Sequence, residues 1–161
     1  MIPPSYNYHP DKIISGGQTG ADQGGLAAAI MLKIPCGGTA PPNFMTDIGP
    51  DSRLKTLYNL TEGEPDISTY RKRTIKNVTD SDGTAWFGET NSPGGRLTLG
   101  EVGRQHKPLS VNQSPEDLRA WCIFNNIKVL NVAGNRERKN PGIFSRVRET
   151  IYMAFRDRSS G

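Results

Sequence analysis

The sequence predicts a single α/β domain, with a mostly parallel sheet and helices on both of its faces. Short segments rich in β-branched residues alternate with helix-like segments along the 161 residues, a pattern typical of β-α-β units. The turns that follow the expected strands are rich in glycine and polar residues. The length fits one domain, and no internal repeat is present.

The first half of the chain contains one clear β-α unit. Residues 12–15 are expected to form a strand and residues 21–32 a helix dominated by Ala, Leu, Ile and Met. Residues 33–36 are short and extended. Residues 37–64 are rich in Pro, Gly, Asn and Asp, and a structureless loop of that size is usually functional or a lid.

The next part of the chain continues the alternation. We expect a helix at residues 68–78 that is basic on one side, a strand at 84–87 and a helix at 95–105. A strand at residues 108–111 follows. Before the next helix, Ser114 has the position of an N-cap, with proline and two acids in the first turn.

The last β-α unit contains a strand at residues 128–132 and a final helix, which we expect Asn140 and Pro141 to cap. Apolar residues recur in this helix at helical spacing. They are expected in the core: Ile143, Phe144, Val147, Ile151 and Phe155. Residues 1–11 contain three prolines, and we expect a flexible arm there, so that the domain itself spans residues 12–161.

The turn after the first strand carries the first candidate site. Glycines allow the backbone to approach an anion closely, and free N–H groups at a helix start attract it. The candidate ligand-binding residues are Gly16, Gly17, Gln18, Thr19, Gly20 and Asp22. A side chain at Gly16 is expected to occupy the place of the ligand phosphate. In the alternative interpretation, the glycines are needed only because the turn requires positive φ angles. Asp22 is then an acidic residue favoured in the first turn by the helix dipole, with no ligand involved.

Two further loops follow strands and are expected at the same edge of the sheet, where ligands bind in such folds. One contributes Gly94, Gly95, Arg96 and Thr98, and the other contributes Gly134, Arg136 and Lys139. Together they can hold a phosphate through amides, a hydroxyl and charged hydrogen bonds. The alternative for the third loop is a solvated run of charges. Asp82 can contact a ribose or a metal, or belong to an ordinary DSDG turn.

Composition limits the partners. The net charge of +4 fits an anionic ligand, but the basic residues are scattered and no nucleic-acid-binding motif is present. No apolar run is long enough to span a membrane. Cys36 and Cys122 provide no disulfide framework, so a cytoplasmic location is expected. No other His or Cys stands at the spacing of a zinc site from His9 or His106, so no bound metal is expected. No catalytic triad pattern is recognised.

The chain resembles the molybdenum-carrier family, a circularly permuted branch of the SLOG superfamily of Rossmann-like nucleotide-binding proteins. The residues that carry the resemblance are 13–22, 34–38, 77–84, the Gly94-Gly95 turn and 130–143. Thr84, inside the third of these segments, joins the expected ligand-binding residues. The resemblance implies a Rossmann-like sheet, self-association as a dimer or tetramer, and a pocket for a phosphorylated ligand, either molybdenum cofactor or a nucleotide.

The sequence therefore favours a non-catalytic carrier or storage protein, with two alternatives. SLOG domains also occur as sensors, so the chain could sequester a nucleotide immune signal such as an ADP-ribose derivative. Within the superfamily, Pro93-Gly94-Gly95 with Thr98 and Glu101 also resembles the loop of cytokinin-activating phosphoribohydrolases. The resemblance gives Glu101 a catalytic role in cleaving nucleoside monophosphates, although Leu97 stands where those enzymes have glycine.

Overall fold

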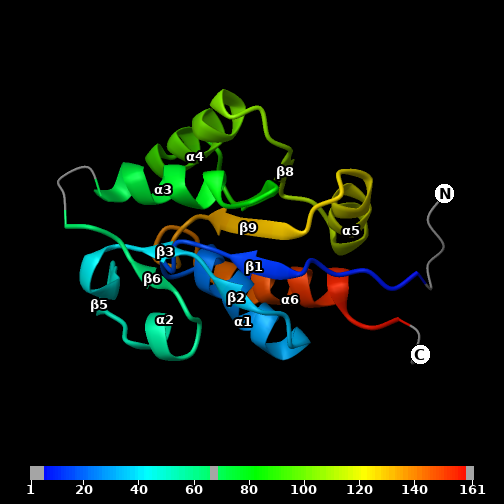
Figure 1. Cartoon of the computed structure of the whole chain (residues 1–161), viewed down its shortest axis with the longest axis horizontal. Coiled ribbons are helices and arrows are strands. Elements are labelled where there is room, and N and C mark those ends of the chain that lie inside the picture. The colour runs from blue at the N-terminus through cyan, green and yellow to red at the C-terminus, as the bar shows by residue number, and fades with distance from the viewer. Residues whose placement is uncertain (1–5, 66–68, 159–161) are drawn as a thin grey trace.

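The computed structural model describes residues 6–65 and 69–158 and contains a five-stranded parallel sheet of order β2-β1-β9-β7-β8 (Figure 1). Its strands are β1 (Lys12–Ile14), β2 (Cys36–Gly37), β7 (Gly83–Phe87), β8 (Leu109–Val111) and β9 (Val129–Gly134). From β1 the chain continues outward to β2, and from β7 it continues outward to β8. The central strand β9 lies between these two halves.

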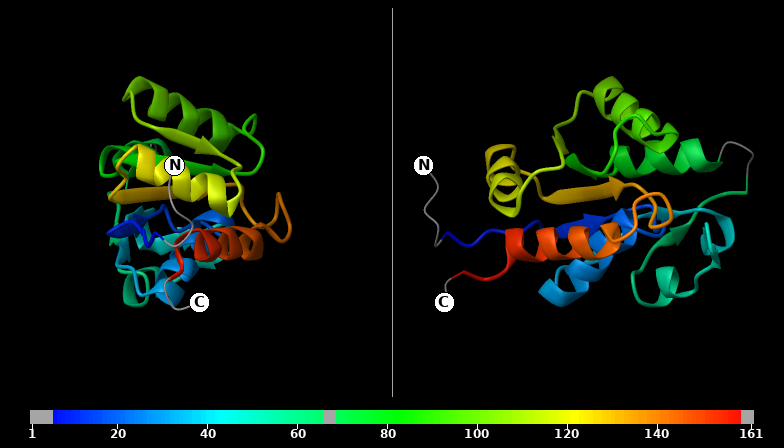
Figure 2. Two further views of the ribbon diagram at one scale, coloured as in Figure 1. Left: turned by 90° about the vertical axis from the view of Figure 1, so that its right-hand side faces the viewer. Right: turned by 180° about the vertical axis from the view of Figure 1, so that it is seen from behind.

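Helices cover both faces of this sheet, so the predicted fold class is confirmed. They are α1 (Ala21–Leu32), α3 (Thr69–Thr79), α4 (Pro93–Arg104), α5 (Pro115–Phe124) and α6 (Ile143–Phe155). Helix α6 packs against α1 and α5, while α3 packs against α4, and both α1 and α4 contact β9. Figure 2 shows these layers from two further sides. None of the helices in the described residues has the length and apolar character needed to cross a bilayer.

Two glycines of α1 allow this helix to approach its neighbours closely. A Cβ at Gly25 would lie 2.7 Å from the Cβ of Val132 in β9, and one at Gly24 would lie 2.7 Å from the carbonyl oxygen of Phe144. Leu26 on the same helix is fully buried. The contact between α1, the sheet and α6 therefore depends on small residues, which holds the turn before α1 firmly against the sheet.

The predicted structureless loop at residues 37–64 is instead folded. It contains β3 (Thr39–Ala40) paired with β6 (Thr61–Glu62), β4 (Met45–Thr46) paired with β5 (Gly49–Pro50), the 3₁₀ helix η1 (Pro42–Phe44) and α2 (Arg53–Thr56). Leu54, Tyr58 and Leu60 are buried in the main core. The prediction was wrong because strands of two residues are too short to produce a detectable periodicity.

The predicted N-terminal cap is present in α5 but not in α6. The Ser114 hydroxyl accepts a hydrogen bond from the Asp117 amide at 3.2 Å, so the predicted N-cap is confirmed. Helix α6 begins one residue after Gly142, which has a φ of 92°, and neither Asn140 nor Pro141 caps it. The carboxylate of Glu137 accepts hydrogen bonds from the amides of Gly142 and Phe144 instead.

The described part of the N-terminal arm lies against the C-terminal helix. The Tyr8 ring meets Phe155 edge-on, with 6.0 Å between ring centroids, and its hydroxyl donates a hydrogen bond to the carbonyl of Ile127. The side chain of Asn7 accepts a hydrogen bond from the amide of Arg158 at 2.8 Å. The two ends of the described chain are therefore neighbours (Figure 1). Residues 1–5 of the expected arm lie outside the described residues.

Candidate functional site

A cavity of about 390 Å³ lies beyond the carboxyl ends of β1, β7 and β9. Helix α3 and the start of α4 provide its walls. This is the place where the chain leaves β1 and β7 in opposite directions, which is where ligands bind in parallel α/β sheets. The volume falls within the range of small-molecule sites.

The structure brings together the three loops that the sequence singled out. The predicted residues that line the cavity are Gly16, Gln18, Asp22, Gly94, Thr98, Gly134, Arg136 and Lys139. The loop after β8 does not contribute to the lining. Its Asn112 instead pairs with the backbone of Gly88 through both ends of its amide, at 2.6 and 2.9 Å, and so fixes the loop after β7.

Other predicted residues lie elsewhere. Thr19 and Gly20 line a second cavity of about 460 Å³, between the Gly16–Asp22 turn and residues 47–58. Five predicted residues belong to neither lining: Gly17, Asp82, Thr84, Gly95 and Arg96. Thr84 lies beneath the main cavity, where its hydroxyl accepts a hydrogen bond from the side-chain amide of Asn131 at 3.2 Å.

Asp82 lies at the opposite edge of the sheet. It immediately precedes β7, and its carboxylate accepts hydrogen bonds from the amides of Lys128 and Val129 at 2.9 and 2.8 Å. The sheet places the amino ends of β7 and β9 side by side there, so this carboxylate ties the two strands together. Asp82 therefore does not border the cavity, although it directly precedes the strand that ends there.

The Gly16–Asp22 turn uses its own side chains to satisfy its amides. The Gln18 amide donates to Oδ2 of Asp22 at 3.2 Å, and the Thr19 amide donates to Oε1 of Gln18 at 3.1 Å. The Gly17 amide donates to the hydroxyl of Ser15. The expectation that this turn offers free N–H groups therefore fails at these three positions.

Most glycines of the predicted site serve packing. An added Cβ would lie 2.4 Å from the carbonyl oxygen of Asn135 at Gly20, 2.4 Å from that of Thr90 at Gly95, and 2.1 Å from that of Phe87 at Gly134. A Cβ at Gly94 would meet nothing within 4 Å, so this glycine alone among the six predicted ones borders open space in the cavity wall.

At Gly16 the space is filled by Arg73 of α3. An added Cβ would lie 1.8 Å from Nη1 of Arg73 and 3.1 Å from Oδ2 of Asp22. The place that the sequence assigned to a phosphate is therefore occupied by a guanidinium group of the protein itself.

Asp22 and Arg73 form a buried ion pair in the cavity. Nη1 of Arg73 lies 3.6 Å from Oδ2 of Asp22, and each residue is 7% exposed. Burial raises the pKa of Asp22 to about 6, and the nearby guanidinium only partly opposes this rise. The Nε atom of Arg73 is buried and has no hydrogen-bond partner. The ion pair therefore leaves the Nε–H group of Arg73 without an acceptor among the described residues.

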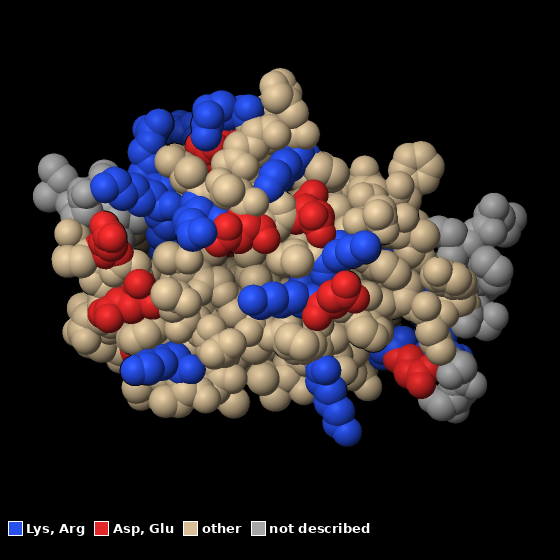
Figure 3. All heavy atoms as spheres, viewed as in Figure 1, with Lys and Arg blue, Asp and Glu red and all other residues tan. Residues whose placement is uncertain are grey.

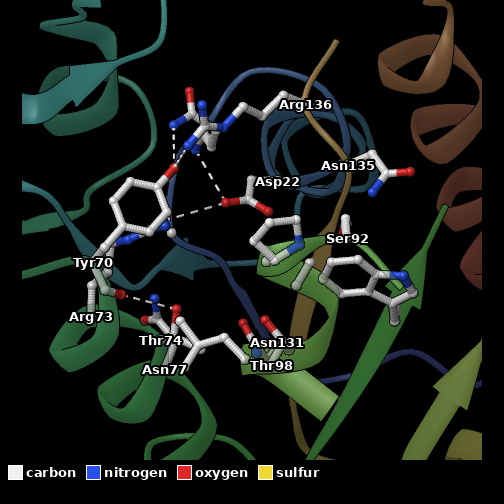
Figure 4. A pocket seen from close by; sticks show the side chains of 18 of the residues that line it. Asp22, Tyr70, Arg73, Thr74, Asn77, Ser92, Thr98, Asn131, Asn135 and Arg136 are labelled. Carbon is white, nitrogen blue, oxygen red and sulfur yellow. Dashed lines mark hydrogen bonds and ion pairs between the residues drawn. The ribbon is translucent and has the colours of Figure 1, made fainter. Parts of the chain in front are cut away.

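Tyr70 of α3 contacts residues from the loops after β1 and β9 (Figure 4). Its hydroxyl accepts hydrogen bonds from Nε2 of Gln18, at 2.8 Å, and from the guanidinium of Arg136. The guanidinium carbons of Arg73 and Arg136 lie 4.5 and 5.4 Å from the centre of its ring, within cation–π range. Two arginines are thus held over the cavity by one aromatic side chain.

The start of α4 and the loop after β9 form a positively charged end of the cavity. The Ser92 hydroxyl caps α4 by accepting from the Gly95 amide at 3.0 Å. Lys139 lines the cavity, and its ammonium group has no partner among the described residues. Lys and Arg side chains also gather on the nearby surface over α3 and α4 (Figure 3). This end can bind an anion through the helix start and the ammonium group.

Glu101 is buried on α4 but does not line this cavity. Its carboxylate pairs with Arg104 at 2.6 Å and accepts a hydrogen bond from Gln105 at 2.9 Å. These partners lower the pKa of Glu101, and the residue is not part of the cavity lining. Glu101 is therefore engaged by neighbours on its own helix and does not border the cavity.

Sequence reasoning missed the contribution of α3. Tyr70, Arg73, Thr74 and Asn77 line the cavity, and their spacing is that of one helical face. Asn77 is fixed, because its side-chain amide bonds both the N–H and the carbonyl of Thr39, at 2.9 and 3.1 Å. This polar face was the available signal, but only the fold reveals that it faces the sheet edge. Trp86, Ser92, Leu97, Asn131 and Asn135 also line the cavity.

Metal-ligating side chains do not cluster in the described part of the chain. Across residues 6–65 and 69–158, no three His, Cys, Asp or Glu side chains lie close enough to hold a metal ion. Any ligand in the main cavity would therefore meet amides, hydroxyls, guanidinium groups, one ammonium group and one carboxylate.

Comparisons with known proteins agree on one family. The model of the circularly permuted YpsA SLOG family matches residues 13–155. A crystal structure from Syntrophus aciditrophicus SB, described as a "putative molybdenum carrier protein", is 37% identical to this chain. The similarity has a TM-score of 0.79 and covers 90% of this chain and 94% of the other. No curated protein matches at a significant level.

Proposed function

Because the chain belongs to the circularly permuted YpsA SLOG family, we propose that it is a non-catalytic binding protein for a small phosphorylated ligand. The cavity at the carboxyl ends of β1, β7 and β9 is the proposed binding site. The candidate ligands are molybdenum cofactor, in line with the description of the similar crystal structure, and a nucleotide. The proposed role is that of a carrier or store.

The observation that carries this proposal is the free cationic end of the cavity. Lys139 faces the cavity without a partner among the described residues, and Gly94 at the start of α4 borders open space. An ammonium group and a helix start together favour a phosphate. The cavity lining also offers polar groups and the indole of Trp86, which suit a ring system.

A binding role is also favoured over hydrolysis. Glu101, the residue that the hydrolase alternative requires, pairs with Arg104 outside the cavity. The carboxylate inside the cavity, Asp22, is paired with Arg73. These contacts support a site that holds its ligand unchanged.

The test compares two lysines that carry the same charge. Lys139 lines the cavity, whereas Lys128 lies at the amino end of β9 on the opposite edge of the sheet. We expect native mass spectrometry of freshly purified protein to reveal a phosphorylated ligand, retained by Lys128→Ala and lost or reduced in Lys139→Ala. Equal retention by both variants, or thermal stability unchanged by a panel of nucleotides and phosphorylated pterins, would contradict the proposal.

A further inference from the structure

Asp22 and Arg73 both line the cavity, and their ion pair leaves part of their hydrogen-bonding capacity without a partner among the described residues. Oδ2 of Asp22 accepts from the Gln18 amide and faces Arg73, whereas Oδ1 accepts no hydrogen bond from the described residues. Nε of Arg73 has no partner although it is buried. Buried polar groups are rarely left unpaired, so a ligand that supplies both partners is expected to bind here.

This pair is unsuited to holding the phosphate. The two side chains neutralise each other, and a phosphate placed beside the Asp22 carboxylate would be repelled. Two other cations line the cavity without an ion pair to a described carboxylate: Lys139, and Arg136, which donates to the Tyr70 hydroxyl. In Figure 4, Tyr70 and Arg73 lie on one side of Asp22, and Ser92 at the start of α4 lies on the other. A phosphate at the start of α4 would therefore lie on the other side of Asp22 from the part of the ligand that meets Arg73.

We propose that Asp22 and Arg73 recognise a lactam edge on the ring of the ligand, which is a ring carbonyl next to a ring N–H. This inference rests on the proposed function. The carbonyl oxygen has two lone pairs and can accept from the guanidinium fork, while the ring N–H donates to Oδ1 of Asp22. Oxopurines and the 4-oxo ring of pterins share this edge. The substrate class is thus a phosphorylated oxo-heterocycle.

Both groups are held in place before any ligand arrives. The guanidinium of Arg73 lies between the Tyr70 ring, at 4.5 Å, and the backbone of Gly16. The Asp22 carboxylate is fixed by the Gln18 amide. Preorganised groups lose little entropy on binding, so their geometry can select between similar ligands.

Three nucleotides that differ only at the ring edge test the proposal. Inosine 5′-monophosphate has the lactam, and adenosine 5′-monophosphate has the donor and acceptor exchanged. Purine riboside 5′-monophosphate lacks the C6 substituent and has no ring N–H at this edge. We expect the unaltered protein to bind the inosine ligand about tenfold or more tightly than either other nucleotide, because a mismatched edge leaves buried groups unpaired. Affinities within twofold of one another would overturn the proposal.

A variant tests whether Asp22 is responsible. Asp22→Asn keeps the shape of the side chain but removes the charge that accepts the ring N–H. We expect its preference for inosine over purine riboside monophosphate to fall to a small fraction of the original. The control Asp80→Asn removes the same charge from an exposed pair with Lys76 and should keep the full preference. An unchanged preference in Asp22→Asn would overturn the proposal.

Inorganic phosphate separates this inference from the proposed function. If phosphate and all three nucleotides bind equally well, the cavity holds phosphorylated ligands but does not read a lactam edge, and only this inference is overturned. If neither phosphate, nor any nucleotide, nor a phosphorylated pterin binds, both proposals are overturned. Isothermal titration calorimetry at one ionic strength gives all of these affinities.

Discussion

The guanidinium of Arg73 occupies the space that a side chain at Gly16 would take. An added Cβ at Gly16 would lie 1.8 Å from Nη1 of Arg73. The glycine that begins the turn after β1 therefore serves the approach of a protein side chain from α3. This relationship links the first loop of the chain to a helix more than fifty residues later, and it determines where the charges of the cavity lie.

Gly16→Ala should displace Arg73 and destabilise the protein. The guanidinium would lose its place between Gly16 and the Tyr70 ring, and overpacking of a buried site typically costs about 1–3 kcal/mol. Urea unfolding measures this loss. Gly94→Ala is the matched control: no atom lies within 4 Å of its added Cβ, so its stability should be unchanged or slightly higher. Equal destabilisation of both variants would contradict the prediction.

Arg136→Ala should weaken ligand binding by about 1–3 kcal/mol, because a half-buried charged hydrogen bond is lost. Arg136 borders the cavity and bonds the Tyr70 hydroxyl. Arg96→Ala removes the same charge from an exposed residue outside the lining and should change the affinity by only a few tenths of a kcal/mol. Calorimetric titration checks both values, and similar losses would assign the effect to net charge alone.

Asp22 should make the protein less stable as the pH rises from about 4 to above 6. Its pKa is about 6 in the folded protein and 3.8 as its ordinary value. The folded state therefore binds the proton more tightly, and stability that is fully present below pH 4 is lost as the pH rises through 6. The expected loss is up to about 3 kcal/mol.

The measurement is the difference in unfolding free energy between the unaltered protein and Asp22→Asn, followed from pH 4 to pH 7.5. Other carboxyl groups contribute equally to both proteins, so they cancel in the difference. The difference should shift in favour of Asp22→Asn as the pH rises. A difference that is independent of pH would rule out the raised pKa.

Glu101→Gln should leave ligand affinity unchanged. Glu101 lies outside the cavity lining, and its carboxylate is paired with the exposed guanidinium of Arg104 on the same helix. We also expect no free base when the unaltered protein is incubated with nucleoside monophosphates, followed by chromatography. Release of base that Glu101→Gln abolishes would revive the hydrolase alternative.

Tyr70→Phe should weaken ligand binding by about 1 kcal/mol without unfolding the protein. The Tyr70 hydroxyl accepts from both Gln18 and Arg136, and its loss frees two side chains that border the cavity. The cation–π contact with Arg73 should remain, because the ring is kept. Titration calorimetry and thermal melting separate the two effects. A large loss of melting temperature with unchanged affinity would contradict this role.

The sequence by itself determined the α/β class, the order along the chain of the five main-sheet strands and of the helices that cover them, and the three loops that meet at the cavity. Strand and helix signals are local, because side-chain periodicity and caps such as Ser114 involve residues a few positions apart. The carboxyl ends of parallel strands necessarily share one edge of the sheet. Convergence of the loops after β1, β7 and β9 was therefore predictable.

Only the tertiary structure decided what each residue does at that edge. Arg73 and Asn77 reach the cavity because α3 packs beside α4, and nothing local to the chain encodes that distance. The same packing brings the guanidinium of Arg73 against Gly16. Strand pairing brings backbone amides at the start of the neighbouring strand within hydrogen-bond distance of the Asp82 carboxylate. Glycines in the sequence indicate where the backbone has no room for a side chain. The atom that takes this room, such as Nη1 of Arg73 at Gly16, belongs to a distant segment, so only the folded structure identifies it.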